Sequence, residues 1–231
     1  MSTADLRFSE QTVAFLEALK RNNDREWFNA HKADYEAHVR APMLAIIERL
    51  SQDFPRIAPD LAATPRSMYR IYRDTRFSPD KTPYKTHVAA AFTHRTLPKS
   101  ESAALYFHFA PGQLWIGAGL YAPGTPQLHR IRQHIAADPD RFRRLVESPA
   151  FRRRGGVHGA KLQRMPRGFP ADHELAEYLK LKQFLAGGEE RNPDIALGPR
   201  LHRTLLRRFE TLAPFVGFLN TPLVAAAGLT R

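Results

Sequence analysis

ALYFHFAPGQLWIGAGLY, residues 104–121, is the stretch that decides the fold. On both sides of Pro111-Gly112, large apolar residues alternate with polar or small ones, which is the period of a strand with one buried face. Proline followed by glycine fits the second and third positions of a type II turn. We therefore predict an antiparallel hairpin in which His108 faces Trp115 across the strands.

The alternation gives this hairpin two unlike faces. Leucine, isoleucine and phenylalanine occupy one face, which we assign to the core. The opposite face carries aromatic and polar-tipped side chains: Tyr106, His108, Trp115 and Tyr121. Gly117 and Gly119 on that face would leave room for a ligand or for a closely packed helix. Two interpretations follow, an open aromatic pocket and a face covered by the helix that carries Trp27.

On either side of the hairpin, short β-branched or aromatic runs predict strands at residues 67–73 and 86–92, with a further edge strand at 183–186. Helical periodicity indicates further elements at 9–20, from Asn23 to about residue 50, and at 126–137, 139–147, 174–181 and 199–218. We expect Pro42 to kink or divide the second of these helices, and residues 55–66 to form a linker-like turn region. Residues 151–170 are predicted to form a basic irregular loop.

This order of elements predicts an α+β fold with a central, mostly antiparallel sheet of about four to five strands, flanked by N- and C-terminal helices. We expect a single integrated domain over residues 7–222 and a C-terminal tail over residues 223–231.

The composition narrows the class of protein. The chain has 231 residues, a formal charge of +12 and no cysteine, which excludes disulfides, thiolate nucleophiles and cysteine-based metal sites. The basic excess lies after residue 65, because residues 1–65 contain more acidic than basic side chains. The first residues do not resemble a secretory signal and no long apolar run is evident, so we expect a cytoplasmic protein without a membrane partner.

The densest chemical segment is RIYRDTRFSPDKTPYKTH, residues 70–87. Its prolines restrict the backbone, and a rigid loop with convergent cations can bind an anion. We predict that the ligand-binding residues are Arg73, Arg76, Lys81 and Lys85 from this loop, together with Tyr106 and Trp115 from the hairpin. The alternative is that Asp74 and Asp80 pair with these cations and hold a structural loop together.

Histidines near this loop are the candidates for acid–base chemistry. His87 and His108 lie on predicted strands, where cationic neighbours would keep an imidazole unprotonated at neutral pH; Asp74 is a weaker candidate. No histidine stands at a strong metal-binding spacing, and no phosphate-binding or dinucleotide glycine motif occurs. We therefore predict neither a metal site nor a cofactor.

Three motifs resemble an uncharacterised bacterial and fungal family built on a domain of unknown function. They are NN with REWF in residues 22–28, RD with RFS, DK and PYK in residues 73–85, and Gly117 to Pro123 followed by Ile131-Arg132. The resemblance covers about residues 7–222 and implies one integrated domain. It implies no activity and no catalytic residue.

Three functions remain open from the sequence. We favour a site for a small phosphate- or carboxylate-bearing ligand, which includes the option of an enzyme. A nucleic-acid-binding module is the second, and it would add five arginines to the loop: Arg152, Arg153, Arg154, Arg164 and Arg167. The third is a structural or protein-interaction domain in which residues 66–87 serve folding alone. The oligomeric state is not predicted.

Overall fold

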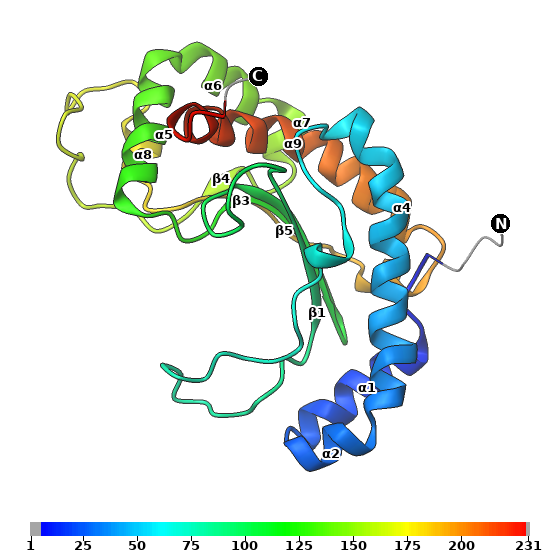
Figure 1. Cartoon of the computed structure of the whole chain (residues 1–231). Coiled ribbons are helices and arrows are strands. Elements are labelled where there is room, and N and C mark those ends of the chain that lie inside the picture. Colours follow the sequence, from blue (N-terminus) through cyan, green and yellow to red (C-terminus); the bar gives the residue numbers. More distant parts are fainter. Residues whose placement is uncertain (1–5, 230–231) are drawn as a thin grey trace.

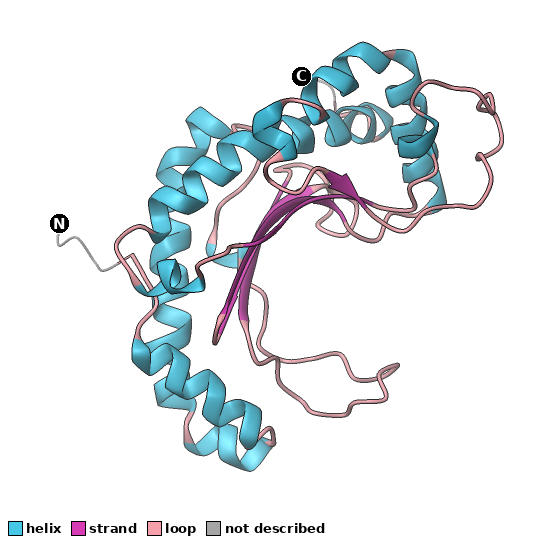
Figure 2. Ribbon diagram, turned by 180° about the vertical axis from the view of Figure 1, so that it is seen from behind, coloured by secondary structure: helices cyan, strands magenta, loops and turns pink. Residues whose placement is uncertain are grey.

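The protein was analysed as a computed structural model that describes residues 6–229. Figures 1 and 2 show a curved sheet whose convex side is covered by helices and whose concave side is open. The strands are β1 (Val88–Thr93), β2 (Ala104–Ala110), β3 (Gln113–Leu120), β4 (Val157–His158) and β5 (Phe184–Glu189). The helices are α1 (Glu10–Arg21), α2 (Arg25–Ala30), α3 (Lys32–Tyr35), α4 (Ala41–Ile57), α5 (Thr125–Ala137), α6 (Pro139–Val146), α7 (Pro149–Arg152), α8 (Ala176–Leu179) and α9 (Leu201–Ala226). The predicted α+β class is confirmed.

The hairpin lies in the middle of the sheet, in the predicted register. The strand order is β1-β2-β3-β5-β4 and every described pairing is antiparallel. His108 is opposite Trp115, and Gly112 in the turn has a φ of +72°, the left-handed conformation that glycine tolerates best. The strand predicted at 183–186 is present as β5, but its placement at the edge was wrong, because β5 lies between β3 and β4.

The predicted strand at 67–73 was also wrong. This segment begins with a 3₁₀ turn (Pro65–Ser67) and then makes only two isolated bridges, Met68 to Ala90 and Tyr72 to Tyr84. Its residues alternate as in a strand, but β1 is the last strand at this edge of the sheet. The segment therefore leads into the loop before β1, which projects away from the sheet in Figures 1 and 2.

The N-terminal helices follow their capping residues. Ser9 caps α1. Asn23, with Glu26 three residues later, has the sequence pattern of a helix cap, but the cap of α2 is Asp24, whose carboxylate accepts a hydrogen bond from the Trp27 N–H at 2.9 Å. The predicted second helix is divided into α2, α3, a π-helical turn (Glu36–Arg40) and α4, with Pro42 in the first turn of α4. α4 runs through Pro55 to Ile57, so the predicted turn region begins later than expected.

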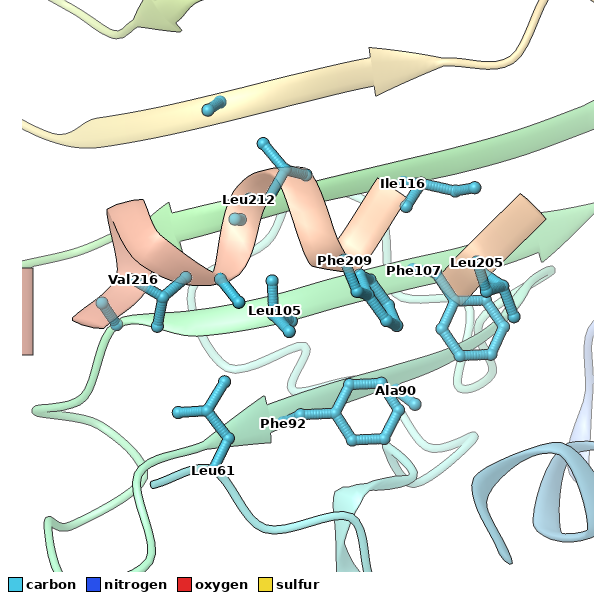
Figure 3. Close-up of a cluster of buried hydrophobic side chains, with 14 of the residues drawn as sticks. Leu61, Ala90, Phe92, Leu105, Phe107, Ile116, Leu205, Phe209, Leu212 and Val216 are labelled. Carbon is cyan, nitrogen blue, oxygen red and sulfur yellow. The ribbon is translucent and has the colours of Figure 1, made fainter. Parts of the chain in front are cut away.

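Helix α9 closes the core against the convex face of the sheet. Figure 3 shows Leu205, Phe209 and Val216 of α9 directed at Leu105 and Phe107 of β2. The Phe209 ring is fully buried among three phenylalanine rings: Phe54, Phe92 and Phe107. By length and composition α9 would be able to cross a membrane, and half of its most apolar stretch is buried inside the fold.

α9 is longer than predicted. It continues past the expected end at residue 218 and past the expected domain boundary at residue 222, and ends at Ala226. The extension is held by packing, because Leu223 is buried.

Candidate functional site

The concave face of the sheet forms the floor of a cavity of about 660 Å³. Small side chains on β1 and at the start of β2, such as Ala89, Ala91 and Ala104, leave this volume open. The other lining residues come from the segments around the sheet: Tyr69, Lys85, His87, Thr93, Lys99, Ser100, Ser102, Tyr106, His108, Trp115, Ala118, Gly119, Leu120, Tyr121, Ala122 and Leu185. Most of the lining is apolar, and its polar side-chain atoms belong to tyrosine, tryptophan, histidine, lysine, serine and threonine residues.

A hydrogen-bonded chain crosses the floor of the cavity and fixes His108. His108 Nδ1 lies 3.1 Å from the Tyr106 hydroxyl, and Nε2 lies 3.0 Å from Gln113 Oε1. The Gln113 amide donates in turn to Glu189 at 3.4 Å, which orients its oxygen toward the histidine. A neutral ring satisfies both contacts, because Nε2–H donates to Gln113 and Nδ1 accepts from Tyr106. The Trp115 ring lies parallel to that of His108, with centroids 6.1 Å apart.

His87 is the second imidazole of the cavity, with its ring centroid 5.1 Å from that of His108. Burial, followed by the charges of His108 and Lys85, lowers the pKa of His87 to about 4. Burial also lowers the pKa of His108, although Gln113 and Glu189 act in the opposite direction. Both rings are therefore neutral at pH 7. In the part of the chain that the structure describes, no hydrogen bond is made by the His87 ring, so its nitrogens can meet a ligand.

Two lysines flank the Tyr69 ring at the cavity. Lys99 Nζ lies 4.2 Å from the ring centroid and Lys85 Nζ lies 6.0 Å from it. Lys85 donates to the carbonyl oxygens of Arg70 at 2.6 Å and Tyr72 at 2.8 Å, which leaves one of its N–H groups unused. Burial lowers the pKa of both lysines, and nearby cations, Lys99 among them, lower that of Lys85 further.

The remaining predicted cations do not line this cavity. Arg73 bonds Asp80 and Thr82, and Lys81 donates to the Thr75 carbonyl at 2.9 Å, all within the loop before β1. These bonds hold the loop in its own shape.

Arg76 and Asp74 are paired with each other on the exposed part of the same loop. Arg76 contacts both carboxylate oxygens of Asp74, at 3.0 and 2.8 Å. These hydrogen bonds hold the pKa of Asp74 at about 2. Asp74 is therefore ionised and engaged at neutral pH, and it lies outside the cavity.

The base of the loop is attached to the N-terminal helices. The Asn23 side chain donates to the Tyr84 carbonyl and accepts from the Tyr84 N–H, both at 3.0 Å. The Phe28 and Tyr84 rings stack with centroids 4.2 Å apart. Two of the motifs quoted above thus meet in space, far apart as they are in the sequence. Trp27 packs on Phe15 and His31, so the interpretation in which its helix covers the aromatic face was wrong.

The glycines of β3 are required by the packing of the sheet itself, although Gly119 also lines the cavity. A Cβ at Gly117 would overlap the Trp115 ring, and one at Gly119 would overlap the Phe184 carbonyl oxygen of β5. Gly119 has a φ of +129°, which a residue with a side chain rarely adopts. These two residues let the indole lie along its own strand and let β5 approach closely.

Five of the candidate catalytic and ligand-binding residues line the cavity, Tyr121 and Gly119 of the predicted aromatic face line it as well, and other residues that shape it were missed. The five candidates are Lys85, His87, Tyr106, His108 and Trp115. Lys99 and Tyr69 were missed, because neither belongs to a motif and their approach depends on how two connecting segments fold. In the described residues, no group of three or more histidine, aspartate or glutamate side chains is placed to hold a metal ion.

The neutral His87 predicts a dependence of stability on pH. Its pKa is about 4 in the fold and about 6.5 in an unfolded chain, so below pH 6.5 the unfolded state binds more protons. Stability is therefore expected to fall as the pH decreases from about 6.5 to about 4. His87→Gln is expected to flatten this part of a plot of Tm against pH.

The exposed His158 provides the control, and His158→Gln should leave the profile of the parent protein unchanged. If His87→Gln also leaves it unchanged, the decrease comes from other groups and His87 is not held neutral by its surroundings.

Comparisons with known proteins place the chain in a family. Among curated proteins, none matches the chain. The family model described as conserved hypothetical protein (DUF2461) matches residues 11–218, from the first turn of α1 into the second half of α9. The match covers the sheet, the loop before β1 and the helices to which that loop is attached. The chain therefore belongs to the DUF2461 family of conserved hypothetical proteins.

Proposed function

We propose that the cavity on the concave face binds a small anionic ligand with an apolar or aromatic body. The observation that carries this proposal is the pair of lysines at Tyr69, on the edge of a cavity that is otherwise mostly apolar. A cavity of about 660 Å³ has the size of a small-molecule site.

The lysines favour a carboxylate or phosphate group. Burial and then the charges of Arg70, Arg73 and Lys99 lower the pKa of Lys85, so the two ammonium groups near the Tyr69 ring repel each other. An anion placed between them would remove the repulsion and receive charge-assisted hydrogen bonds. The backbone carbonyls that hold Lys85 in place reduce the entropy lost on binding.

The floor favours a flat or apolar body. Tyr106, His108 and Trp115 present aromatic surfaces, and the alanines of β1 allow a ligand to approach the sheet closely. His87 supplies a neutral imidazole, in which one nitrogen can accept a hydrogen bond from a ligand and the other can donate one, and the ring can take part in proton transfer.

Ligand binding can be tested by thermal shift and calorimetry with phenyl phosphate and indole-3-acetate as anionic probes and benzyl alcohol as a neutral one. At about one hundred times its dissociation constant, an anionic probe is expected to raise Tm by about 5–10 °C. Lys99→Met should weaken its binding about tenfold, because a charge-assisted contact is lost. Lys99→Arg, which keeps the charge, should retain most of the affinity.

Lys182→Met is the matched control, since Lys182 is exposed and does not line the cavity. It should bind the probes like the parent protein. Equal binding by Lys99→Met and the parent, or equal responses to the neutral and anionic probes, would contradict an anion site at these lysines.

A further inference from the structure

A second cleft lies in the helical layer, away from the concave cavity. Its volume is about 540 Å³, and its lining comes from α6, the segment around α7, and α9. The lining residues are Arg144, Leu145, Ser148, Ala150, Arg153, Arg154, Arg207, Glu210, Thr211 and Pro214. Three separate segments of the chain thus bring four arginines to one depression.

The charge of these four arginines is only partly balanced by the protein. Within residues 6–229, none of the four forms an ion pair, whereas the neighbouring Arg143, Arg152 and Arg208 each pair with a glutamate. The lining contains one carboxylate, that of Glu210, and it is engaged by Arg56 at 2.8 Å. The cleft therefore holds a local excess of positive charge.

Burial and mutual repulsion make the positive charge of the cleft unfavourable for the free protein. Arg154 is half-buried, and burial together with the charges of Arg208, Arg207 and Arg153 lowers its pKa, although Glu190 acts in the opposite direction. Placing like charges close together is unfavourable, and a bound anion would relieve this repulsion. The hydroxyls of Ser148 and Thr211 already donate to the carbonyls of Leu145 and Arg207, so the guanidinium groups are the free donors of the cleft.

We infer that this cleft binds the phosphate groups of a ligand that carries two or more of them. Guanidinium groups form paired hydrogen bonds with phosphate oxygens, and arginine is favoured over lysine where such planar recognition is needed. Four guanidinium groups offer more hydrogen-bond donors than one phosphate group can use. The same chemistry is offered by a free polyphosphate, as in a nucleotide, and by the backbone of a nucleic acid.

The test compares two triple variants that lose the same charge. Arg144→Gln, Arg153→Gln and Arg207→Gln together remove the exposed arginines of the cleft and keep the half-buried Arg154. The control combines Arg130→Gln, Arg164→Gln and Arg167→Gln, which are exposed and lie outside the cleft. Binding of tripolyphosphate and of a short fluorescent single-stranded oligonucleotide is measured at low and moderate salt.

We expect the cleft variant to lose about tenfold or more in affinity for tripolyphosphate, and the control to change less than about twofold. Lys99→Met should bind tripolyphosphate like the parent, which separates this cleft from the concave cavity. If the oligonucleotide binds and is also lost in the cleft variant, the ligand is a nucleic-acid backbone. If tripolyphosphate alone binds, the ligand is a free polyphosphate.

Three results would overturn the inference. The first is an equal loss of affinity in the two triple variants, which would indicate diffuse attraction to net charge. The second is a loss of tripolyphosphate binding in Lys99→Met. The third is that neither probe binds to the parent protein. Far-ultraviolet circular dichroism and Tm of each variant establish that it is folded before binding is compared.

Discussion

Arg208→Met is expected to lower the free energy of unfolding by about 3–5 kcal/mol, because it removes the ion-pair partner of the largely buried Glu190 carboxylate. Arg208 of α9 bonds Glu190, the residue that follows β5, and their side chains are only 9% and 13% exposed. Methionine fills much of the volume of arginine, so the loss comes mainly from the Glu190 carboxylate, which keeps the attraction of Arg154 but loses its ion-pair partner. Urea unfolding of the parent and the variant measures this difference.

An exposed ion pair provides the comparison. Arg56 and Glu210 are 2.8 Å apart with side chains 64% and 38% exposed, so Arg56→Met should cost less than about 1 kcal/mol. Combining Arg208→Met with Glu190→Leu should restore most of the stability, because both buried charges are then removed. Equal small losses in the two single variants would mean that the Arg208–Glu190 pair is solvated and has no special role.

Gly119→Ala is expected to destabilise the sheet by about 3–5 kcal/mol, since it adds both backbone strain and a steric overlap. The new Cβ would meet the carbonyl oxygen of Phe184 in the neighbouring strand β5, and the φ of +129° disfavours any side chain. Relief requires β3 and β5 to separate, which would also disturb the cavity beside them. Thermal and urea unfolding give the size of the loss.

Gly112→Ala separates the two causes. Gly112 also has a positive φ, +72°, but an added Cβ there meets no atom within 4 Å. This variant should lose only about 1–2 kcal/mol from strain. A loss at Gly119 no larger than that at Gly112 would show that β5 can move away at little cost.

The local pattern of the sequence determined the hairpin and its faces. Strict alternation over residues 104–121, with Pro111-Gly112 between the strands, permits one register only, because a shift by one residue would turn the apolar side chains to solvent. The same rule assigned Tyr106, His108 and Trp115 to the concave face. Capping and periodicity likewise located α1, α5 and α6 to within a residue or two.

Other features were readable from the sequence but depended on a partner far along the chain. Arg208 stands on the apolar stripe of α9, between Leu205 and Leu212, which signals a buried arginine; only the fold brings Glu190 to it. Asn23 has the sequence pattern of a helix cap, yet its amide bonds the backbone of Tyr84 and Asp24 caps α2 instead. Local propensity cannot distinguish between these uses of a polar side chain.

The tertiary structure alone decided which cations reach the cavity. The loop over residues 70–87 contains enough acceptors to bind Arg73, Arg76 and Lys81 within itself, while Lys99 arrives from the connection between β1 and β2. Composition and spacing count charges, but they do not determine which of them are neutralised by neighbours. That outcome depends on distances between segments, and these are set when the sheet curves and the helices pack behind it.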